Sequence, residues 1–166
     1  MNTPASSNDI PTLTRQLAGL LLAKGQMMAT AESCTGGMIA AACTDVAGSS
    51  AWFERGFVTY SNEAKTELLG VPAALIVEHG AVSEPVVRAM AEGALRLSKA
   101  HVAVAVTGVA GPGGGSAGKP VGSVWLGWAT AAGVVTQLRH FEGDRQQVRQ
   151  ATVQHALQGL NELLLA

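Results

Sequence analysis

The sequence predicts an α/β fold, specifically a three-layer α/β/α sandwich in which a mixed sheet has helices on both faces. Segments with strand-like and helix-like patterns alternate along the first two thirds of the chain, which is typical of a largely parallel sheet. A strand hairpin and a closing helix follow, and they add antiparallel strands to that sheet. Hydrophobic residues make up 48% of the 166 residues and charged residues only 14%, as expected for a sheet buried between helices.

The chain has the length of one ordinary domain. We expect a flexible polar tail over residues 1–10 and a single domain over residues 11–166. No internal repeat divides that domain further.

The first predicted elements are a helix, a strand and a second helix. Leucines recur at helical spacing over residues 11–24, and a glycine ends this amphipathic helix. The short apolar run at 27–31 predicts a strand, because the turn-prone sequence SCTGG follows it. The alanine-rich segment 38–46 predicts the second helix.

A second strand and two further helices follow. Large apolar residues alternate with other residues over 52–60, as in a strand. Asn62 is a suitable N-cap for a helix over 63–69, which a glycine ends. Ser83 predicts a capping box and the start of a helix that continues to about Ser98.

The last third of the sequence predicts a central strand, a long loop, a hairpin and a helix. Residues 101–107 alternate and are rich in β-branched side chains, whereas residues 108–120 are rich in glycine and form the longest loop. Residues 121–130 and 134–141 predict an antiparallel hairpin. Asp144 caps a final helix that runs nearly to the end of the chain.

Charge and hydropathy argue against nucleic acid and membrane partners. The net charge is −1, and lysines and arginines are scattered singly, so the chain offers no basic surface for a phosphodiester backbone. No apolar stretch is long enough to span a membrane, and the first residues lack the pattern of a signal sequence. We therefore expect a cytoplasmic protein.

The cysteines and histidines give no reason to expect a disulfide, a metal or a cofactor. Cys34 and Cys43 would lie about 13 Å apart along one helix, too far for a disulfide, so both are expected to stay reduced. The four histidines lie far apart in the sequence, and none pairs with another ligand at helical spacing.

The first candidate catalytic residue follows the first predicted strand. Strand ends in such sheets meet in one crevice, and Ser33 lies at a strand end just before a helix. Free backbone N–H groups of Thr35, Gly36 and Gly37 could there hold the oxyanion of a tetrahedral intermediate. The alternative is that Ser33 is only an N-cap and that the glycines serve a tight turn.

Two more candidates follow the second strand. With Asn62 as N-cap, Lys65 occupies the third helical position, where the helix dipole lowers the pKa of a lysine. An amine with a lowered pKa can accept the proton of a serine hydroxyl. Tyr60 could donate a hydrogen bond to a substrate or relay a proton. The alternatives are a solvated surface lysine and a tyrosine at the edge of the core.

The third strand end leads into the glycine-rich loop through Thr107, Gly108 and Gly111. Backbone N–H groups of this loop could wrap a phosphate, with Lys119 or Arg145 as the counter-charge. A simple connection between two strands explains the glycines equally well.

Two familiar patterns inside that loop are rejected. Residues 114–118 fit G-x-S-x-G, but no strand precedes them directly and no helix follows. The stretch that ends at Lys119 resembles a P-loop, but Pro120 stands where a serine or threonine is required.

Several long segments together resemble the C-terminal domain family of the competence- and damage-inducible protein CinA. The resemblance covers nearly the whole chain from Leu13 to the final helix. The segments that carry it are ATAESCTGG, AGSSAWFERGFVTYSNEAK, HGAVSEPV, VTGVAGPGGG and KPVGSVW.

This resemblance implies an activity and assigns residues to it. Stand-alone members of the family hydrolyse the carboxamide of nicotinamide mononucleotide to nicotinate mononucleotide and ammonia, in pyridine nucleotide recycling, with a serine and lysine pair. Ser33 and Lys65 match that pair, and Tyr60 matches the tyrosine of the same motif. The implied partner is a small nucleotide substrate, and no cofactor is implied. The substrate-binding residues that we expect are Thr35, Gly36, Gly37, Asn62, Thr107, Gly108, Gly111 and Arg145.

Two other functions stay open at this point. The domain could bind a nucleotide or a partner without turnover, or the same serine could hydrolyse another small amide. A homo-oligomer is also open, because Trp52, Trp125 and Trp128 could pack either in a core or at a subunit interface.

Overall fold

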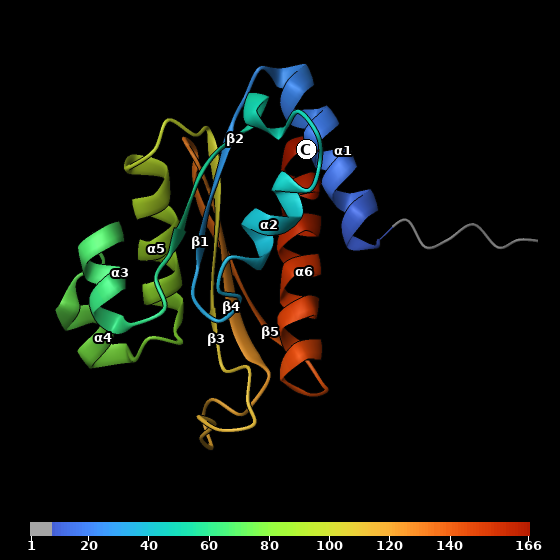
Figure 1. Cartoon of the computed structure of the whole chain (residues 1–166). Helices are drawn as coiled ribbons and strands as arrows, with labels where there is room; N and C mark the ends of the chain where they lie inside the picture. The colour runs from blue at the N-terminus through green and yellow to red at the C-terminus, as the bar shows by residue number, and fades with distance from the viewer. Residues whose placement is uncertain (1–7) are drawn as a thin grey trace, which may run out of the picture.

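Five strands form one mixed sheet in the order β2-β1-β3-β4-β5 in the computed structural model, which describes residues 8–166 (Figure 1). β1 pairs in parallel with β2 and β3, whereas β4 pairs antiparallel with β3 and β5. The strands are β1 (Met28–Glu32), β2 (Phe53–Val58), β3 (Val102–Gly108), β4 (Ser123–Thr130) and β5 (Gly133–His140). The predicted mixed sheet is confirmed.

Helices cover both faces of the sheet, so the predicted three-layer architecture is also confirmed (Figure 1). One layer contains α1 (Ile10–Lys24), α2 (Met38–Thr44) and α6 (Arg145–Leu165). The other contains α3 (Asn62–Leu69), α4 (Ala73–His79) and α5 (Glu84–Arg96). A short 3-10 helix, Ser49–Ala51, leads into β2.

The two faces of β3 differ in side-chain size, and this sets how closely the helices approach. The buried valines of β3 pack in the core under α1 and α6, whereas Ala103 and Ala105 pack in the core under α5. The small side chains let α5 lie close to the sheet. At Gly127 of β4, an added Cβ would lie 3.3 Å from the backbone oxygen of Val87 in α5.

Two of the three tryptophans belong to the core. Trp52 and Trp128 are buried in the cluster between the sheet and the α1–α6 layer, and the indole of Trp128 donates to the backbone oxygen of Ala156 at 3.1 Å. Gly159 lets α6 pass over this ring, because an added Cβ would lie 2.3 Å from it. Trp125 is only half-buried.

The first helix begins one residue earlier than predicted. Helix α1 begins at Ile10, and the side chain of Asp9 caps it by accepting from the N–H of Thr12 at 2.8 Å. The expected flexible tail therefore does not extend to residue 10. Residues 1–7 of that tail lie outside the described residues.

Two predicted caps are wrong. Ser61, not Asn62, caps α3, because its side chain accepts from the N–H of Ala64 at 3.0 Å while Asn62 is already helical. The hydroxyl of Ser83 donates to the backbone oxygen of Gly80 at 2.7 Å and accepts from no N–H of α5, so it forms no capping box.

The cap of α6 was predicted correctly, whereas α4 was not predicted at all. Asp144 and Gln147 form a reciprocal capping box at the start of α6. α4 is a single short helix with one buried residue, Ile76, and therefore has no clear apolar period. Among residues 8–166, no helix combines the length and the apolar character that crossing a membrane requires.

Candidate active site

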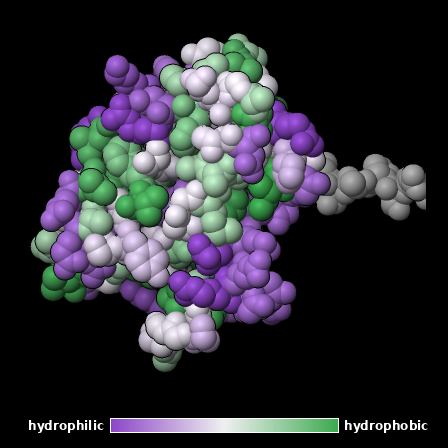
Figure 2. All heavy atoms as spheres, in the orientation of Figure 1, coloured by the Kyte–Doolittle hydropathy of each residue, from purple (hydrophilic) through white to green (hydrophobic). Residues whose placement is uncertain are grey.

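The carboxyl ends of β1, β2 and β3 meet at one end of the sheet, where a cavity of about 310 Å³ opens. The glycine-rich loop projects from the surface at this end, with strongly hydrophilic residues beside it (Figures 1 and 2). Most of the predicted site residues line the cavity, namely Ser33, Tyr60, Asn62, Lys65, Thr107, Gly108, Gly111 and Arg145.

Ser33 and Lys65 are in direct contact in this cavity. The Nζ of Lys65 lies 3.0 Å from the Oγ of Ser33. It also lies 2.8 Å from the backbone oxygen of Thr59 and 3.1 Å from that of Tyr60. Ser33 is 8% exposed and Lys65 is 1% exposed. No carboxylate among residues 8–166 forms a salt bridge with this lysine.

Burial lowers the pKa of Lys65. The sequence predicted this direction from the helix dipole, but α3 begins one residue earlier and places Lys65 in its fourth position. Desolvation is the main cause. A neutral amine has two N–H groups and one lone pair. With its N–H groups on the two carbonyls, its lone pair is free to accept the proton of Ser33.

The strand and the turn around Ser33 hold it at the sheet end. Its N–H donates to the backbone oxygen of Val106 at 3.1 Å, which continues the pairing of β1 with β3. The preceding residue, Glu32, is fully buried and accepts from the N–H groups of Ile39 at 2.8 Å and Ala40 at 3.1 Å. It also accepts from the hydroxyl of Thr35 at 2.6 Å. The carboxylate therefore ties the turn to the first residues of α2.

One of the three predicted oxyanion donors is not available. The N–H of Gly36 is not free, because it donates to the backbone oxygen of Ser33 at 3.1 Å to close the turn before α2. Thr35, Gly36 and Gly37 do not line the cavity, whereas Cys34 does. Among the described residues, the N–H groups of Cys34, Thr35 and Gly37 donate to no backbone oxygen. Of these three residues only Cys34 lines the cavity, and its N–H is the one next to Ser33.

Cys34 is not a rival nucleophile, although its side chain is beside Ser33. Burial raises the pKa of its thiol to about 11, so the thiol stays protonated at neutral pH. The sequence analysis placed Cys34 in one helix with Cys43, but in the structure Cys34 precedes α2. Both cysteines are buried free thiols.

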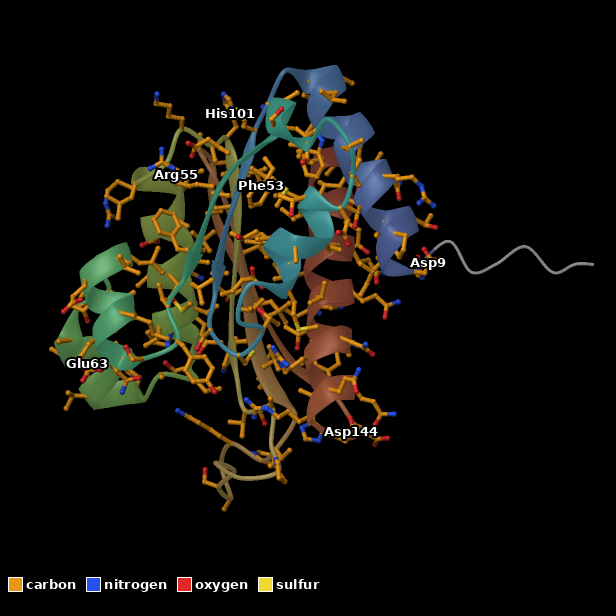
Figure 3. The ribbon with its side chains drawn as sticks, in the orientation of Figure 1. Asp9, Phe53, Arg55, Glu63, His101 and Asp144 are labelled. Atoms are coloured by element: carbon orange, nitrogen blue, oxygen red, sulfur yellow. The ribbon has the colours of Figure 1, made fainter. Side chains whose placement is uncertain are left out.

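Tyr60 and Arg145 meet at the mouth of the cavity. The Nη2 of Arg145 lies 3.3 Å from the hydroxyl of Tyr60, and its Nη1 donates to the backbone oxygen of Gly111 at 2.8 Å. Arg145 is the first residue of α6, next to the labelled cap Asp144 (Figure 3). One guanidinium group thus joins the loop after β2 to the glycine-rich loop.

The side chains of Thr107 and Lys119 each donate a hydrogen bond to a backbone oxygen. The Thr107 hydroxyl donates to the backbone oxygen of Ala81 at 2.9 Å and so holds the segment before α5 against the cavity. The Nζ of Lys119 donates to the backbone oxygen of His79 at 2.7 Å, and Lys119 does not line the cavity. Of the two predicted counter-charges, only Arg145 faces the site.

Sequence patterns missed two features of the site. Val82 lines the cavity from the segment between α4 and α5, which depends on the unpredicted helix α4. Arg149 of α6 contacts the turn after Ser33, and its spacing of one helical turn from Arg145 was the only available signal. In the part of the chain that the structure describes, no group of three or more metal-ligating side chains is present.

Comparison with known proteins finds one matching family model, described as the CinA C-terminal domain, over residues 11–164. Nicotinamide-nucleotide amidohydrolase PncC of Escherichia coli K12 is 53% identical over 156 residues, which are 93% of this chain and 94% of that protein. The protein of the same name from Pseudomonas putida is 55% identical over 154 residues, which are 93% of this chain and 96% of that protein.

Solved structures with the same fold are also similar in sequence. The competence/damage inducible protein CihA of Agrobacterium tumefaciens has a TM-score of 0.92 and 47% identity, and the match covers 100% of both chains. The competence damage-inducible protein A of Klebsiella pneumoniae has a TM-score of 0.92 and 42% identity, over 95% of this chain and 98% of that one.

Proposed function

This chain belongs to the CinA C-terminal domain family, and from that membership we propose that it is a nicotinamide-nucleotide amidohydrolase. Its substrate is nicotinamide mononucleotide, and the products are nicotinate mononucleotide and ammonia. The names of the similar PncC proteins of Escherichia coli and Pseudomonas putida support this activity. The observation that carries the mechanism is the buried contact of 3.0 Å between the amine of Lys65 and the hydroxyl of Ser33.

In the first half of the reaction, neutral Lys65 accepts the proton of Ser33, and the serine oxygen attacks the carboxamide carbon. The carbonyl oxygen becomes an oxyanion. Cys34 lines the cavity beside the nucleophile, and in this proposal its N–H donates to the oxyanion. The lowered pKa of Lys65 supports this role, because an ordinary lysine stays protonated at neutral pH.

In the second half, the amide C–N bond breaks and ammonia leaves with a proton from Lys65. Tyr60 assists this transfer. Its hydroxyl lies within hydrogen-bonding distance of Arg145, which can only donate, so the tyrosine proton is available to the cavity. Lys65 is then neutral again and activates the water that hydrolyses the acyl-serine ester to the carboxylate and free Ser33.

Arg145 and the glycine-rich loop hold the ribose phosphate in this proposal. Arg145 lines the cavity and is exposed, whereas the Lys65 amine is buried, and a guanidinium group pairs well with a phosphate. Asn62, Thr107, Gly108 and Gly111 line the same cavity. We also place the reaction in pyridine nucleotide recycling in the cytoplasm, which product analysis in cell fractions would test.

The experiment compares wild type, Ser33→Ala and the control Ser116→Ala on nicotinamide mononucleotide. Ser116 is the serine of the rejected G-x-S-x-G match and does not line the cavity. Ammonia and nicotinate mononucleotide are measured, and calorimetry follows binding. We expect S33A to bind nicotinamide mononucleotide but to release no ammonia. S116A should match wild type in both measurements.

Three outcomes would contradict the proposal. Ammonia release by S33A would remove Ser33 as the nucleophile. Binding without release by the wild type would indicate a silent binding module. Release of ammonia only from other amides in a substrate panel would indicate an amidase of different specificity.

A further inference from the structure

A second arginine of α6, Arg149, donates hydrogen bonds to the turn that follows Ser33. The Nε of Arg149 donates to the backbone oxygen of Cys34 at 3.1 Å, and its Nη2 donates to that of Thr35 at 3.3 Å. The arginine and these carbonyls lie more than a hundred residues apart in sequence. Arg149 is half-buried and does not line the cavity.

The carbonyls of Ser33, Cys34 and Thr35 are held in different ways. The oxygen of Ser33 accepts from the N–H of Gly36, and that of Thr35 accepts from the N–H of Met38, both at 3.1 Å. The oxygen of Cys34 accepts from no backbone N–H among residues 8–166. Its hydrogen bond comes from Arg149, so this side chain fixes the peptide plane between Cys34 and Thr35.

That peptide plane adjoins the plane that carries the N–H of Cys34, the donor proposed for the oxyanion. The peptide group is planar, so neighbouring planes share a Cα and can rotate only about its two dihedral angles. The N–H of Cys34 belongs to the preceding plane, which the hydrogen bond from Gly36 holds at the oxygen of Ser33. Arg149 holds the next plane at the oxygen of Cys34. The two contacts together fix the dihedral angles of Cys34, which set the direction of its N–H relative to the turn. Stabilisation of an oxyanion depends on donors that are already aimed at it.

We propose that Arg149 is a positioning residue that aims the N–H of Cys34 at the oxyanion by holding the carbonyls of Cys34 and Thr35. The inference rests on the proposed amidohydrolase function. Arg149 acts through the turn and does not contact the substrate. Its loss therefore lowers kcat and leaves KM nearly unchanged, whereas loss of Arg145, which faces the cavity, raises KM.

The turn keeps a second attachment when Arg149 is removed. The carboxylate of Glu32 still binds the Thr35 hydroxyl and the first N–H groups of α2. A variant at position 149 therefore folds with Ser33 still at the end of β1, and only the direction of the Cys34–Thr35 peptide is released.

The test compares Arg149→Gln and Arg149→Lys with the control Arg55→Gln. Arg55 also donates to a distant backbone oxygen, that of Leu97 at 3.1 Å, but it lies at the opposite end of the molecule from Asp144 and the site (Figure 3). For ammonia release, we expect kcat of R149Q to fall on the order of 100-fold at unchanged KM. R149K retains one donor and should recover part of that loss, and R55Q should match wild type.

A second measurement does not need the natural substrate. A fluorophosphonate probe labels an active serine when Oγ bonds to phosphorus, fluoride leaves and the serine proton passes to the base. The phosphoryl oxygen occupies the place of the oxyanion. Labelling of Ser33 should slow in R149Q as strongly as kcat falls, with partial recovery in R149K.

The outcomes separate this inference from the proposed function. A wild type that releases no ammonia but is labelled at Ser33 would contradict the substrate, while slower labelling of R149Q would still support the role of Arg149. Wild-type kcat and labelling in R149Q would overturn the inference. A loss in R55Q equal to that in R149Q would also overturn it, because the effect would then be general destabilisation.

Discussion

The amine of Lys65 reaches the hydroxyl of Ser33 from a different element, α3, and two backbone oxygens fix its direction. Thr59 and Tyr60 supply those oxygens from the segment between β2 and α3, at 2.8 and 3.1 Å. The lysine is thus surrounded by acceptors that suit either its charged or its neutral form, while burial favours the neutral one. A base that is neutral near working pH is what serine activation requires.

The pH dependence of the reaction should follow Lys65. Protonated Lys65 cannot accept a proton, so kcat/KM should rise with pH up to the pKa of Lys65 in the folded protein. Burial places that pKa below the ordinary value of 10.5. The rate profile of the wild type from pH 5 to 11 measures it. A rising limb centred at or above 10.5 would contradict a lysine with a lowered pKa.

A matched variant separates the proton transfer from the hydrogen bonds. Arginine at position 65 can still donate to the carbonyls but stays protonated, so Lys65→Arg should lower kcat by at least about 100-fold. An active K65R variant would exclude Lys65 as the base.

The lowered pKa of Lys65 also affects stability. Between the pKa of Lys65 in the folded protein and its higher pKa in the unfolded chain, the unfolded chain binds more protons. The free energy of unfolding should therefore rise with pH in that window.

Arg145 should determine whether the enzyme needs a phosphate on its substrate. We expect Arg145→Ala to raise KM for nicotinamide mononucleotide by about 10- to 100-fold, because a charge-assisted hydrogen bond is lost. Nicotinamide riboside lacks the phosphate, so its KM should change little. Steady-state kinetics on both substrates gives the comparison. Equal increases for both substrates would mean that Arg145 only shapes the cavity through Tyr60 and Gly111.

Glu32 should contribute to stability because its carboxylate is buried and fully used. In Glu32→Gln an amide NH₂ group replaces one oxygen and meets a backbone N–H of α2, so two donors face each other. We expect a loss of about 1–3 kcal/mol in the free energy of unfolding, measured by urea denaturation. The exposed Glu92→Gln should change it by less than about 0.5 kcal/mol. Equal stability of E32Q and wild type would contradict this reasoning.

The positions of Ser33 and Lys65 could be predicted because each follows a strand that the sequence marks clearly. Strand ends of a parallel sheet converge, so local patterns allowed the two residues to meet, and the resemblance to the CinA family assigned them as a pair. The exact cap of α3 could not be predicted, because Ser61 and Asn62 are neighbours with similar capping ability. That difference of one residue moved Lys65 to the fourth position of α3. The burial that lowers its pKa depends on packing, which the local pattern did not show.

Contacts between distant segments were beyond the reach of local pattern. Arg149 meets Cys34 across 115 residues, and nothing near either residue marks the pairing. The turn after Ser33 shows the same difficulty. Its glycines indicate a tight turn, but only the folded chain shows that the N–H of Gly36 is already bonded and that the N–H of Cys34 is not. Helix α4 could not be predicted because its 7 residues are too few to show an apolar period.

A pair of helix glycines should respond to alanine in opposite ways. Gly93 of α5 packs on α3, and an added Cβ would lie 2.1 Å from the backbone oxygen of Leu69, so Gly93→Ala must separate the two helices. We expect it to lose about 1–3 kcal/mol of unfolding free energy. Gly19 of α1 has no atom within 4 Å of an added Cβ, so Gly19→Ala should gain up to about 1 kcal/mol through helix propensity. Because α3 carries Lys65, only G93A should also lower kcat for ammonia release. Chemical denaturation of both variants tests the signs, and a stabilised G93A would show that α3 can shift without cost.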